Sequence, residues 1–148
     1  MNREELARKK LGAAAVILNE AGHVLLVRHT YGRLNWELPG GYAEAAESVI
    51  GTAVREVREE TDLSVRALHT TGTYYDPEHD MHHFVFLCEA ADGEVPRPDS
   101  TEVSACAFWA AGALPRPISD FTIRRITDAV AGNRQPLPSI VEPRRWLE

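Results

Sequence analysis

The chain has 148 residues, the size of one globular domain, and 44% of them are hydrophobic and 26% charged. These proportions exclude a disordered tail, a collagen and a coiled coil. The net charge of −6 argues against binding to a nucleic acid backbone, so an anionic substrate would need clustered arginines or a bound cation. Only Lys9 and Lys10 are lysines, so nearly all positive charge is guanidinium. This suits bidentate phosphate contacts but is equally explained by genome composition.

The N-terminal region is predicted to be a surface arm or short helix over residues 1–10, followed by a strand. The apolar run 11–18 follows two lysines, as in a signal peptide. However, acidic residues precede it, no small-residue cleavage site follows, and about 20 residues are needed to span a membrane. The run therefore predicts no membrane partner. Cys88 and Cys106 lie in apolar segments without metal-site spacing, so we expect two free buried thiols. Free thiols indicate a reducing, cytoplasmic setting.

The first third of the chain is predicted to consist of short strands. Two apolar runs separated by the turn 19–22 predict a β-hairpin, and a third short strand ends at two glycines. From residue 47 the apolar period becomes helical. The predicted elements are strands 13–18 and 23–29, a loop 32–35, a strand 36–38 and a helix 48–61.

The rest of the chain is predicted to add strands, loops and a second helix. Ser119 or Asp120 can cap this helix, which runs to about Val130 and ends at Gly132. The tail from Pro136 is either an ordered arm or frayed. The remaining predicted elements are one or two strands over 64–75, strands 83–89 and 103–109, and loops 76–80 and 90–100. In strand 83–89, Phe84, Phe86 and Cys88 are predicted to share one face. Strands on both sides of a central helix predict a mixed α/β architecture in a single domain over 1–148, with a tail over 133–148.

The central helix carries a concentration of acidic residues. At about 100° per residue, one arc is apolar and forms the predicted core face, while three glutamates spaced i, i+3 and i+4 share another arc. The core arc holds Ile50, Ala53, Val54, Val57 and Thr61, and the acidic arc holds Glu56, Glu59 and Glu60. Like charges at this spacing cost about 0.2–0.5 kcal/mol per pair. The arc is either a solvated face paired with neighbouring arginines or a site for a hard cation such as Mg²⁺ or Mn²⁺.

The segment before the helix favours the metal interpretation. Residues 38–41 form a turn with two glycines, which places bare backbone near the helix start. Glu47 lies two turns ahead of Arg55, so a contact between them could tie the loop to the helix. A loop held over three carboxylates is typical of a metal site with an additional carbonyl ligand.

These residues match a known motif. Gly41, Glu47, Arg55-Glu56, Glu59-Glu60 and Leu63 have the spacing of the Nudix box, and the approach 36–40 is also similar to that family. Residues 11 to about 130 therefore resemble the Nudix hydrolase family, which implies an α/β/α sandwich with a mixed β-sheet. Asp62 stands where the family usually has glycine. Because this site favours a left-handed residue, we expect a cost of at most about 1 kcal/mol and an intact helix.

The resemblance implies roles for individual residues. Glu56, Glu59 and Glu60 would hold one or more Mg²⁺ ions, for which Mn²⁺ can substitute, and Gly41 would add its carbonyl. Arg55 would orient a glutamate, and the general base would be Glu56 or Glu102, just before the last clear strand. The implied activity is Mg²⁺-dependent hydrolysis of the diphosphate linkage in a nucleoside diphosphate derivative, such as a sugar nucleotide or ADP-ribose. The alternatives are a nucleoside triphosphate pyrophosphohydrolase and a non-catalytic nucleotide-sensing module.

Other residues are weaker candidates for substrate binding. Arg28 and Arg33 could bind a terminal phosphate or a ribose, or they could be surface arginines. Tyr75, with Tyr74, could stack on a base, or both could be ordinary strand residues. His79, His82 and His83 could form a zinc site, but adjacent strand residues point to opposite faces, which favours a polar loop. Three aromatic residues are predicted core: Trp36, Phe108 and Trp109. Residues 144–146 would anchor a dimer arm or form a loose tail, and a homodimer is common among relatives.

Overall fold

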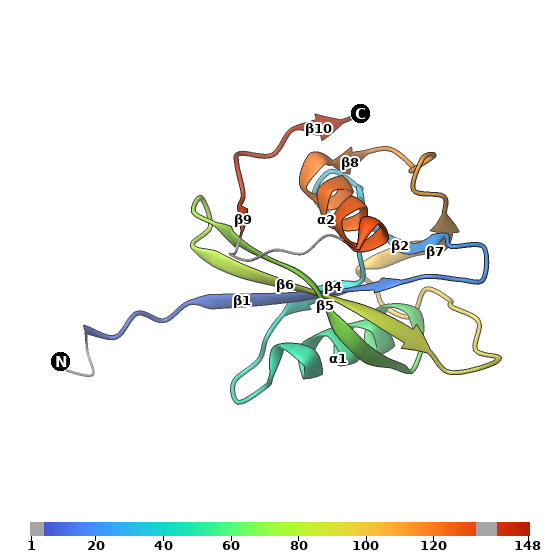
Figure 1. Ribbon diagram of the computed structural model, residues 1–148, viewed down its shortest axis with the longest axis horizontal. Helices are drawn as coiled ribbons and strands as arrows, with labels where there is room; N and C mark the ends of the chain where they lie inside the picture. Colours follow the sequence, from blue (N-terminus) through green and yellow to red (C-terminus); the bar gives the residue numbers. More distant parts are fainter. Residues whose placement is uncertain (1–4, 133–138) are drawn as a thin grey trace.

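The computed structural model describes residues 5–132 and 139–148, and in it two helices cover opposite faces of a central sheet (Figure 1). The strands are β1 (Lys10–Ile17), β2 (Val24–His29), β3 (Trp36–Glu37), β4 (Gly40–Tyr42), β5 (Val65–Asp76), β6 (Met81–Ala90), β7 (Val103–Trp109), β8 (Ile118–Ser119), β9 (Ser139–Ile140) and β10 (Trp146–Leu147). The helices are α1 (Val49–Thr61) and α2 (Asp120–Ala131). This is the α/β/α sandwich expected from the sequence.

The sheet is mixed and lies between the two helices. The central sheet has the order β4-β1-β6-β5-β9, in which β1 runs parallel to β6 and antiparallel to β4. A second sheet has the order β3-β2-β7, and β8 pairs with β10. In the described chain, β5 is a single strand interrupted by two register shifts, and β7 has the predicted bounds.

Two apolar layers hold the helices to the sheet, and β1 contributes to both. Ala14 and Val16 face the layer under α2, whereas Ala13 and Ile17 face the layer over α1. A strand buried on both faces reads as a continuous apolar run, which explains the run that begins at residue 11. Phe86 of β6 lies in the α1 layer with its predicted face partners, Phe84 and Cys88.

The predicted hairpin between the first two strands is wrong. The turn exists: the Asn19 carboxamide accepts hydrogen bonds from the backbone N–H groups of Ala21 and His23. Beyond one isolated bridge between Leu18 and Val24, however, β1 and β2 separate into different sheets. Each strand is apolar on both faces, so each is stabilised by two other strands rather than by its neighbour in sequence.

The two glycines that were expected to stop a strand instead form one. Gly40 and Gly41 belong to β4, which pairs with β1. A Cβ at Gly40 would collide with the Ala13 carbonyl oxygen, so only glycine allows the two strands to approach this closely. The strand prediction failed here because glycine is normally depleted from strands.

Helix α1 has the predicted extent and ends at the predicted left-handed residue. The Ser48 hydroxyl accepts a hydrogen bond from the Gly51 N–H, and Asp62 ends the helix with φ 60°. The predicted core face is wrong at one position, because Ile50 is 50% exposed. Thr52 is buried in its place, and its hydroxyl is satisfied by hydrogen bonds to Glu47 and to the Ser48 carbonyl.

Helix α2 and the C-terminal segment form the other side of the molecule. Ser119 caps α2, and Gly132 ends it with φ 65°. Residues 133–138, where the predicted tail starts, lie outside the described residues. From Ser139 the chain pairs with β5 and then, through β10, with β8. Residues 144–146 therefore pack on their own chain, so the loose tail is wrong, and the dimer arm stays a prediction.

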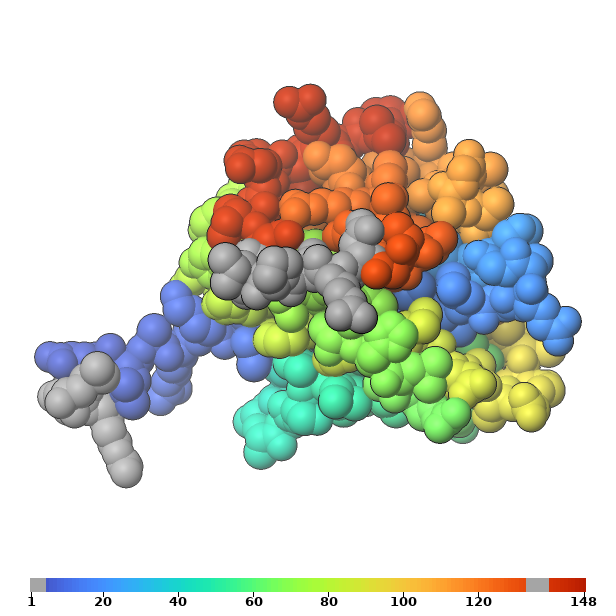
Figure 2. Space-filling model, in the orientation of Figure 1, coloured from blue at the N-terminus to red at the C-terminus, as the bar shows by residue number. Residues whose placement is uncertain are grey.

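The space-filling view agrees with the packing of the C-terminal segment on its own chain. Figure 2 shows the red C-terminal segment lying against the orange residues of α2 and its surroundings, while the blue residues before β1 project from the body. No helix within residues 5–132 and 139–148 is long and apolar enough to cross a membrane. Cys88 and Cys106 are both free, as expected, but only Cys88 is buried and Cys106 is half-buried.

Candidate active site

The acidic face of α1 lies against the bare backbone of β4. Glu60 is only 6% exposed, and its carboxylate accepts a hydrogen bond of 3.0 Å from the Gly40 N–H. A Cβ at Gly41 would lie 2.6 Å from the Glu56 carboxylate. The glycines therefore allow two carboxylates of the helix to meet main chain, as the motif spacing predicts.

Arg55 connects the acidic residues to the loop before the helix. Its guanidinium donates to both carboxylate oxygens of Glu47, at 2.7 and 2.9 Å, and to Glu56 at 2.9 Å. It also donates to Glu59 at 3.2 Å and to the Tyr42 carbonyl at 3.1 Å. The hydrogen bonds from Arg55 lower the pKa of Glu47 to about 2, so this pair is fully charged. The predicted pairing of Glu47 with Arg55 is confirmed.

The three glutamates occupy different environments. Burial raises the pKa of Glu60 to about 8, and the nearby charge of Glu56 adds to this rise. Burial also raises the pKa of Glu56, although Arg55 opposes it. Glu59 is 55% exposed and turns toward Arg55. Crowded, poorly solvated carboxylates beside a main-chain carbonyl form an all-oxygen donor set, which fits a hard divalent cation.

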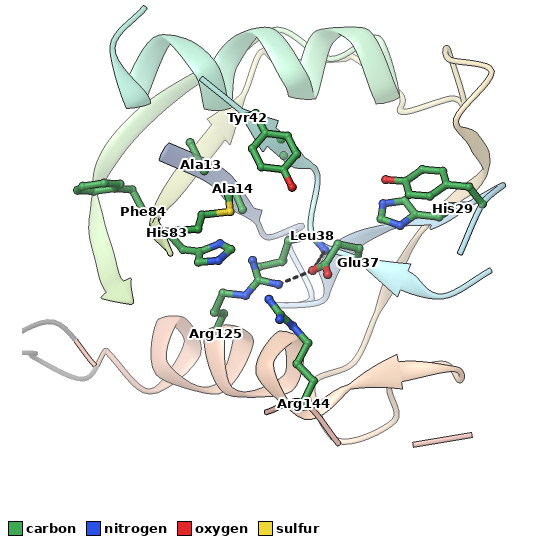
Figure 3. A pocket seen from close by; sticks show the side chains of 15 residues that line it. Ala13, Ala14, His29, Glu37, Leu38, Tyr42, His83, Phe84, Arg125 and Arg144 are labelled. Atoms are coloured by element: carbon green, nitrogen blue, oxygen red, sulfur yellow. Dashed lines mark hydrogen bonds and ion pairs between the residues drawn. The ribbon is translucent and has the colours of Figure 1, made fainter. Parts of the chain in front are cut away.

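A cavity of about 160 Å³ lies directly beside these glycines (Figure 3). Its wall includes Gly40 and Gly41 together with polar side chains from distant parts of the chain: Glu37, His83, Arg125 and Arg144. A second cavity of about 520 Å³ adjoins it and shares several lining residues, including His83 and Arg144. Their combined size is in the range typical of small-molecule sites.

The charges in the cavity wall are arranged in pairs. Arg125 donates to the Glu37 carboxylate at 2.6 Å, and Arg144 donates to the buried Asp76 carboxylate at 3.0 Å. Burial, followed by the charges of Arg125 and Arg144, lowers the pKa of His83 to about 4. His83 is therefore neutral near pH 7, and the wall carries two positive and two negative charges.

Sequence reasoning did not find these wall residues. Arg125 and Glu37 are 88 residues apart in sequence, so nothing local indicates their contact. One signal was present for Arg125, since it lies four residues after Phe121 on the apolar face of α2. An arginine on such a face requires a buried partner. Arg144 offered no comparable signal.

The predicted substrate-binding residues have other partners. Arg28 donates to the Leu34 carbonyl, and Tyr75 donates to Asp80. Arg33 donates to the Glu148 carboxylate at 2.8 Å and lies over the Trp146 ring. Among the described residues that line the two cavities, Arg28, Arg33 and Tyr75 do not occur. Their binding roles stay predictions.

Glu102 lies in an exposed position before β7. Its backbone carbonyl accepts a hydrogen bond from the Thr30 N–H, at the start of the loop that carries Tyr31. Burial, followed by the charges of Glu102 and Glu60, raises the pKa of Tyr31. Glu102 and Glu60 thus act on the same region, and the role of Glu102 as a base also stays a prediction.

The three histidines do not share a metal site. The His82 ring lies tilted against Tyr75 and the His83 ring packs edge-to-face against Phe121, from opposite faces of β6 as expected. His79 pairs with Asp76 at 2.8 Å. Among the described residues, Asp76, Glu78 and His79 lie close enough to hold an ion, but Asp76 already binds Arg144. The polar-loop interpretation therefore holds for His79 but not for His82 and His83, which belong to β6. Tyr74 and Trp36 are buried core residues.

Comparisons with known proteins agree with this site. The NUDIX domain model matches residues 8–130. A Bacillus subtilis (strain 168) protein named "Putative 8-oxo-dGTP diphosphatase" is 32% identical over 118 residues, which cover 74% of this chain and 78% of that protein. A crystal structure of an ADP-ribose pyrophosphatase from Streptococcus suis 89-1591 is 26% identical with a TM-score of 0.69, covering 90% of this chain and 98% of that one.

The fold and the acidic helix define a hydrolase that acts on phosphoric anhydrides. The chain belongs to the Nudix family.

Proposed function

We propose that this Nudix hydrolase is a Mg²⁺-dependent pyrophosphohydrolase that cleaves the diphosphate linkage of a nucleoside diphosphate derivative. One observation carries the proposal: Glu56 and Glu60 meet the Gly40–Gly41 backbone where these glycines also line a cavity. A diphosphate held at the carboxylates would direct its attached group into that cavity.

The residues that would hold Mg²⁺, or Mn²⁺ in its place, are Glu56, Glu59, Glu60 and the carbonyl of Gly41. When bound, the cation supplies charge neutralisation for the phosphates and lowers the pKa of a bound water. The donor set supports this assignment because it is all oxygen and because burial makes unpaired carboxylates costly there.

The other contributions to catalysis come from side chains of the protein. Arg55 holds Glu56 on one side and Glu47 on the other, which fixes the carboxylate in position. Glu56 has a raised pKa, which makes it a better proton acceptor than an ordinary glutamate. Glu102 is the alternative base, since, besides burial, its charge and that of Glu60 both raise the pKa of Tyr31. Most of the rate acceleration should come from positioning and electrostatics.

The proposal is tested with purified protein and a panel of ADP-ribose, UDP-glucose, dGTP and 8-oxo-dGTP in Mg²⁺. We expect Glu59→Gln to lose at least about 100-fold in turnover with an unchanged fold, because Glu59 is 55% exposed. Glu20→Gln, in the exposed turn between β1 and β2, is the matched control and should keep full turnover. A panel without any turnover would refute the proposal.

A triphosphate substrate is the second candidate, favoured by the name of the Bacillus subtilis relative. Products separate the two candidates, since a triphosphate yields pyrophosphate and a monophosphate whereas a nucleotide sugar yields two monophosphates. Binding of nucleotides without turnover would instead identify a sensing module. A cytoplasmic setting, supported by the two free cysteines, and a homodimer complete the proposal.

A further inference from the structure

Asp62, the residue at which the chain departs from the usual motif, makes contacts that a glycine could not make. It ends α1 in the left-handed region, with φ 60°. Its carboxylate accepts a hydrogen bond of 3.0 Å from Nε of Arg97 and lies 3.4 Å from Nε of Arg58. The Asp62 side chain is 32% exposed and that of Arg97 64%, and such an ion pair stabilises a fold only slightly. Stability alone therefore does not account for the carboxylate at this position.

Main-chain hydrogen bonds beside this ion pair attach residues 97–102, the docked segment, to the end of α1. The Arg97 N–H donates to the Thr61 carbonyl at 3.0 Å, and the Asp99 N–H donates to the Glu60 carbonyl at 3.1 Å. Both acceptors belong to the last turn of the helix, where carbonyls have no partner within the helix. Glu60 is also the most buried glutamate of the acidic arc. The docked segment is therefore attached to the same turn that carries this carboxylate.

The other end of the docked segment is attached beside the cavity. The backbone carbonyl of Thr101 accepts a hydrogen bond from the Thr30 hydroxyl at 2.8 Å, and that of Glu102 accepts one from the Thr30 N–H at 2.9 Å. The two neighbours of Thr30, His29 and Tyr31, line the cavity whose wall also contains the two glycines of β4. The backbone of Glu102 is thus held between the last turn of α1 and this cavity.

We propose that Asp62 is a positioning residue: through Arg97 it holds the docked segment on α1 and so directs the Glu102 carboxylate toward a diphosphate at the acidic face. Glu102 then accepts a proton from the attacking water. The water oxygen bonds to phosphorus as the bond from phosphorus to the bridging oxygen breaks and leaves its electron pair on that oxygen. Asp62 and Arg97 act only through the position of Glu102. The inference rests on the proposed function and selects Glu102 from its two candidate bases.

Asp62→Gly is the sharpest variant, because glycine adopts this backbone conformation without strain and α1 should end as before. With a compound that the protein hydrolyses, we expect kcat to fall at least about 5-fold while KM changes less than about 2-fold. Arg97→Gln should have the same effect, and Arg97→Lys, which keeps a cation beside Asp62, should recover most of the activity. Arg66→Gln is the matched control and should keep full kcat, because it breaks an exposed ion pair with Glu89 outside the docked segment. Unchanged kcat in Asp62→Gly, or a loss confined to KM, overturns the inference.

A double variant tests whether Asp62 acts through Glu102. If it does, Glu102→Gln already removes the group that the docked segment positions, so adding Asp62→Gly should lower kcat less than about 1.5-fold further. A purely structural effect on α1 would lower kcat by the same factor in both backgrounds, and this result overturns the inference. Full turnover by Glu102→Gln alone also overturns it, although hydrolysis with Glu56 as the base would stand.

Amide hydrogen exchange separates this inference from the proposed function, because it needs no turnover. In Asp62→Gly, the amides of Arg97 and Asp99 should exchange at least about 5-fold faster than in the unsubstituted protein, while that of Val57 keeps its rate. Unchanged exchange overturns the inference whether or not any compound is hydrolysed. Faster exchange with no turnover of any compound would refute the proposed function, and the role of Glu102 with it, and leave only the attachment of the docked segment to α1.

Discussion

Arg55 shows how one side chain can organise the proposed metal site without being a ligand. Its planar fork makes two hydrogen bonds to Glu47 and further bonds to Glu56 and Glu59. Arg55→Lys keeps the charge but cannot span these partners. We expect kcat/KM to fall at least about tenfold, because small misplacements of catalytic groups are costly. Arg58→Lys, on the exposed side of the same helix, is the control. Equal activity of both variants would show that only the charge matters.

His83 links the cavity to a pH dependence of stability. Its pKa is lowered from 6.5 to about 4, so between these values the unfolded chain binds a proton that the native chain does not. The free energy of unfolding therefore falls as pH drops from 6.5 toward 4, by about 2–3 kcal/mol for this group. Urea unfolding across this pH range should show that the free energy of unfolding falls more steeply for the unsubstituted protein than for His83→Phe. The exposed His69→Gln should keep the native slope, and identical slopes for all three would contradict the assignment.

At the scale of single elements, the two glycines of β4, Gly40 and Gly41, have different roles. A Cβ at Gly40 meets the backbone of Ala13, which cannot move without separating β4 from β1. A Cβ at Gly41 meets the end of the flexible Glu56 side chain. We expect Gly40→Ala to lower the free energy of unfolding by about 2 kcal/mol or more. Gly41→Ala should cost less than about 1 kcal/mol but reduce turnover by displacing Glu56. Urea unfolding and kinetics on both variants check this, and a reversed order would contradict it.

The same elements show what the sequence could and could not predict. Helix α1 was predictable because its caps, Ser48 and Asp62, and its acidic spacing are local signals. Strand pairing was not predictable. Because β1 and β2 are each apolar on both faces, their sequences do not indicate which strands they pair with. The cavity beside the glycines was also not predictable, because its wall is built from contacts such as that between Arg144 and Asp76, 68 residues apart.

Across the whole molecule, the C-terminal segment connects β5 of the central sheet to the start of α2. Ile140 pairs with Tyr75 of β5, and Trp146 pairs with Ser119 at the start of α2. Arg144, between these two pairings, reaches the cavity wall. Residues 139–148 lie beyond residues 8–130, which match the NUDIX domain model.

Two adjacent residues test whether this segment is part of the cooperative fold. Val141 is 4% exposed in the layer under α2, whereas its neighbour Ile140 is 55% exposed. We expect Val141→Ala to lower the free energy of unfolding by about 2 kcal/mol, because a buried cavity is created, and Ile140→Ala to change it by less than about 0.5 kcal/mol. Since Arg144 follows three residues later, loosening this anchor should also raise KM more than it lowers kcat. Urea unfolding with steady-state kinetics measures both effects. Equal stability of the two variants would show that residues 139–148 are held independently of the core.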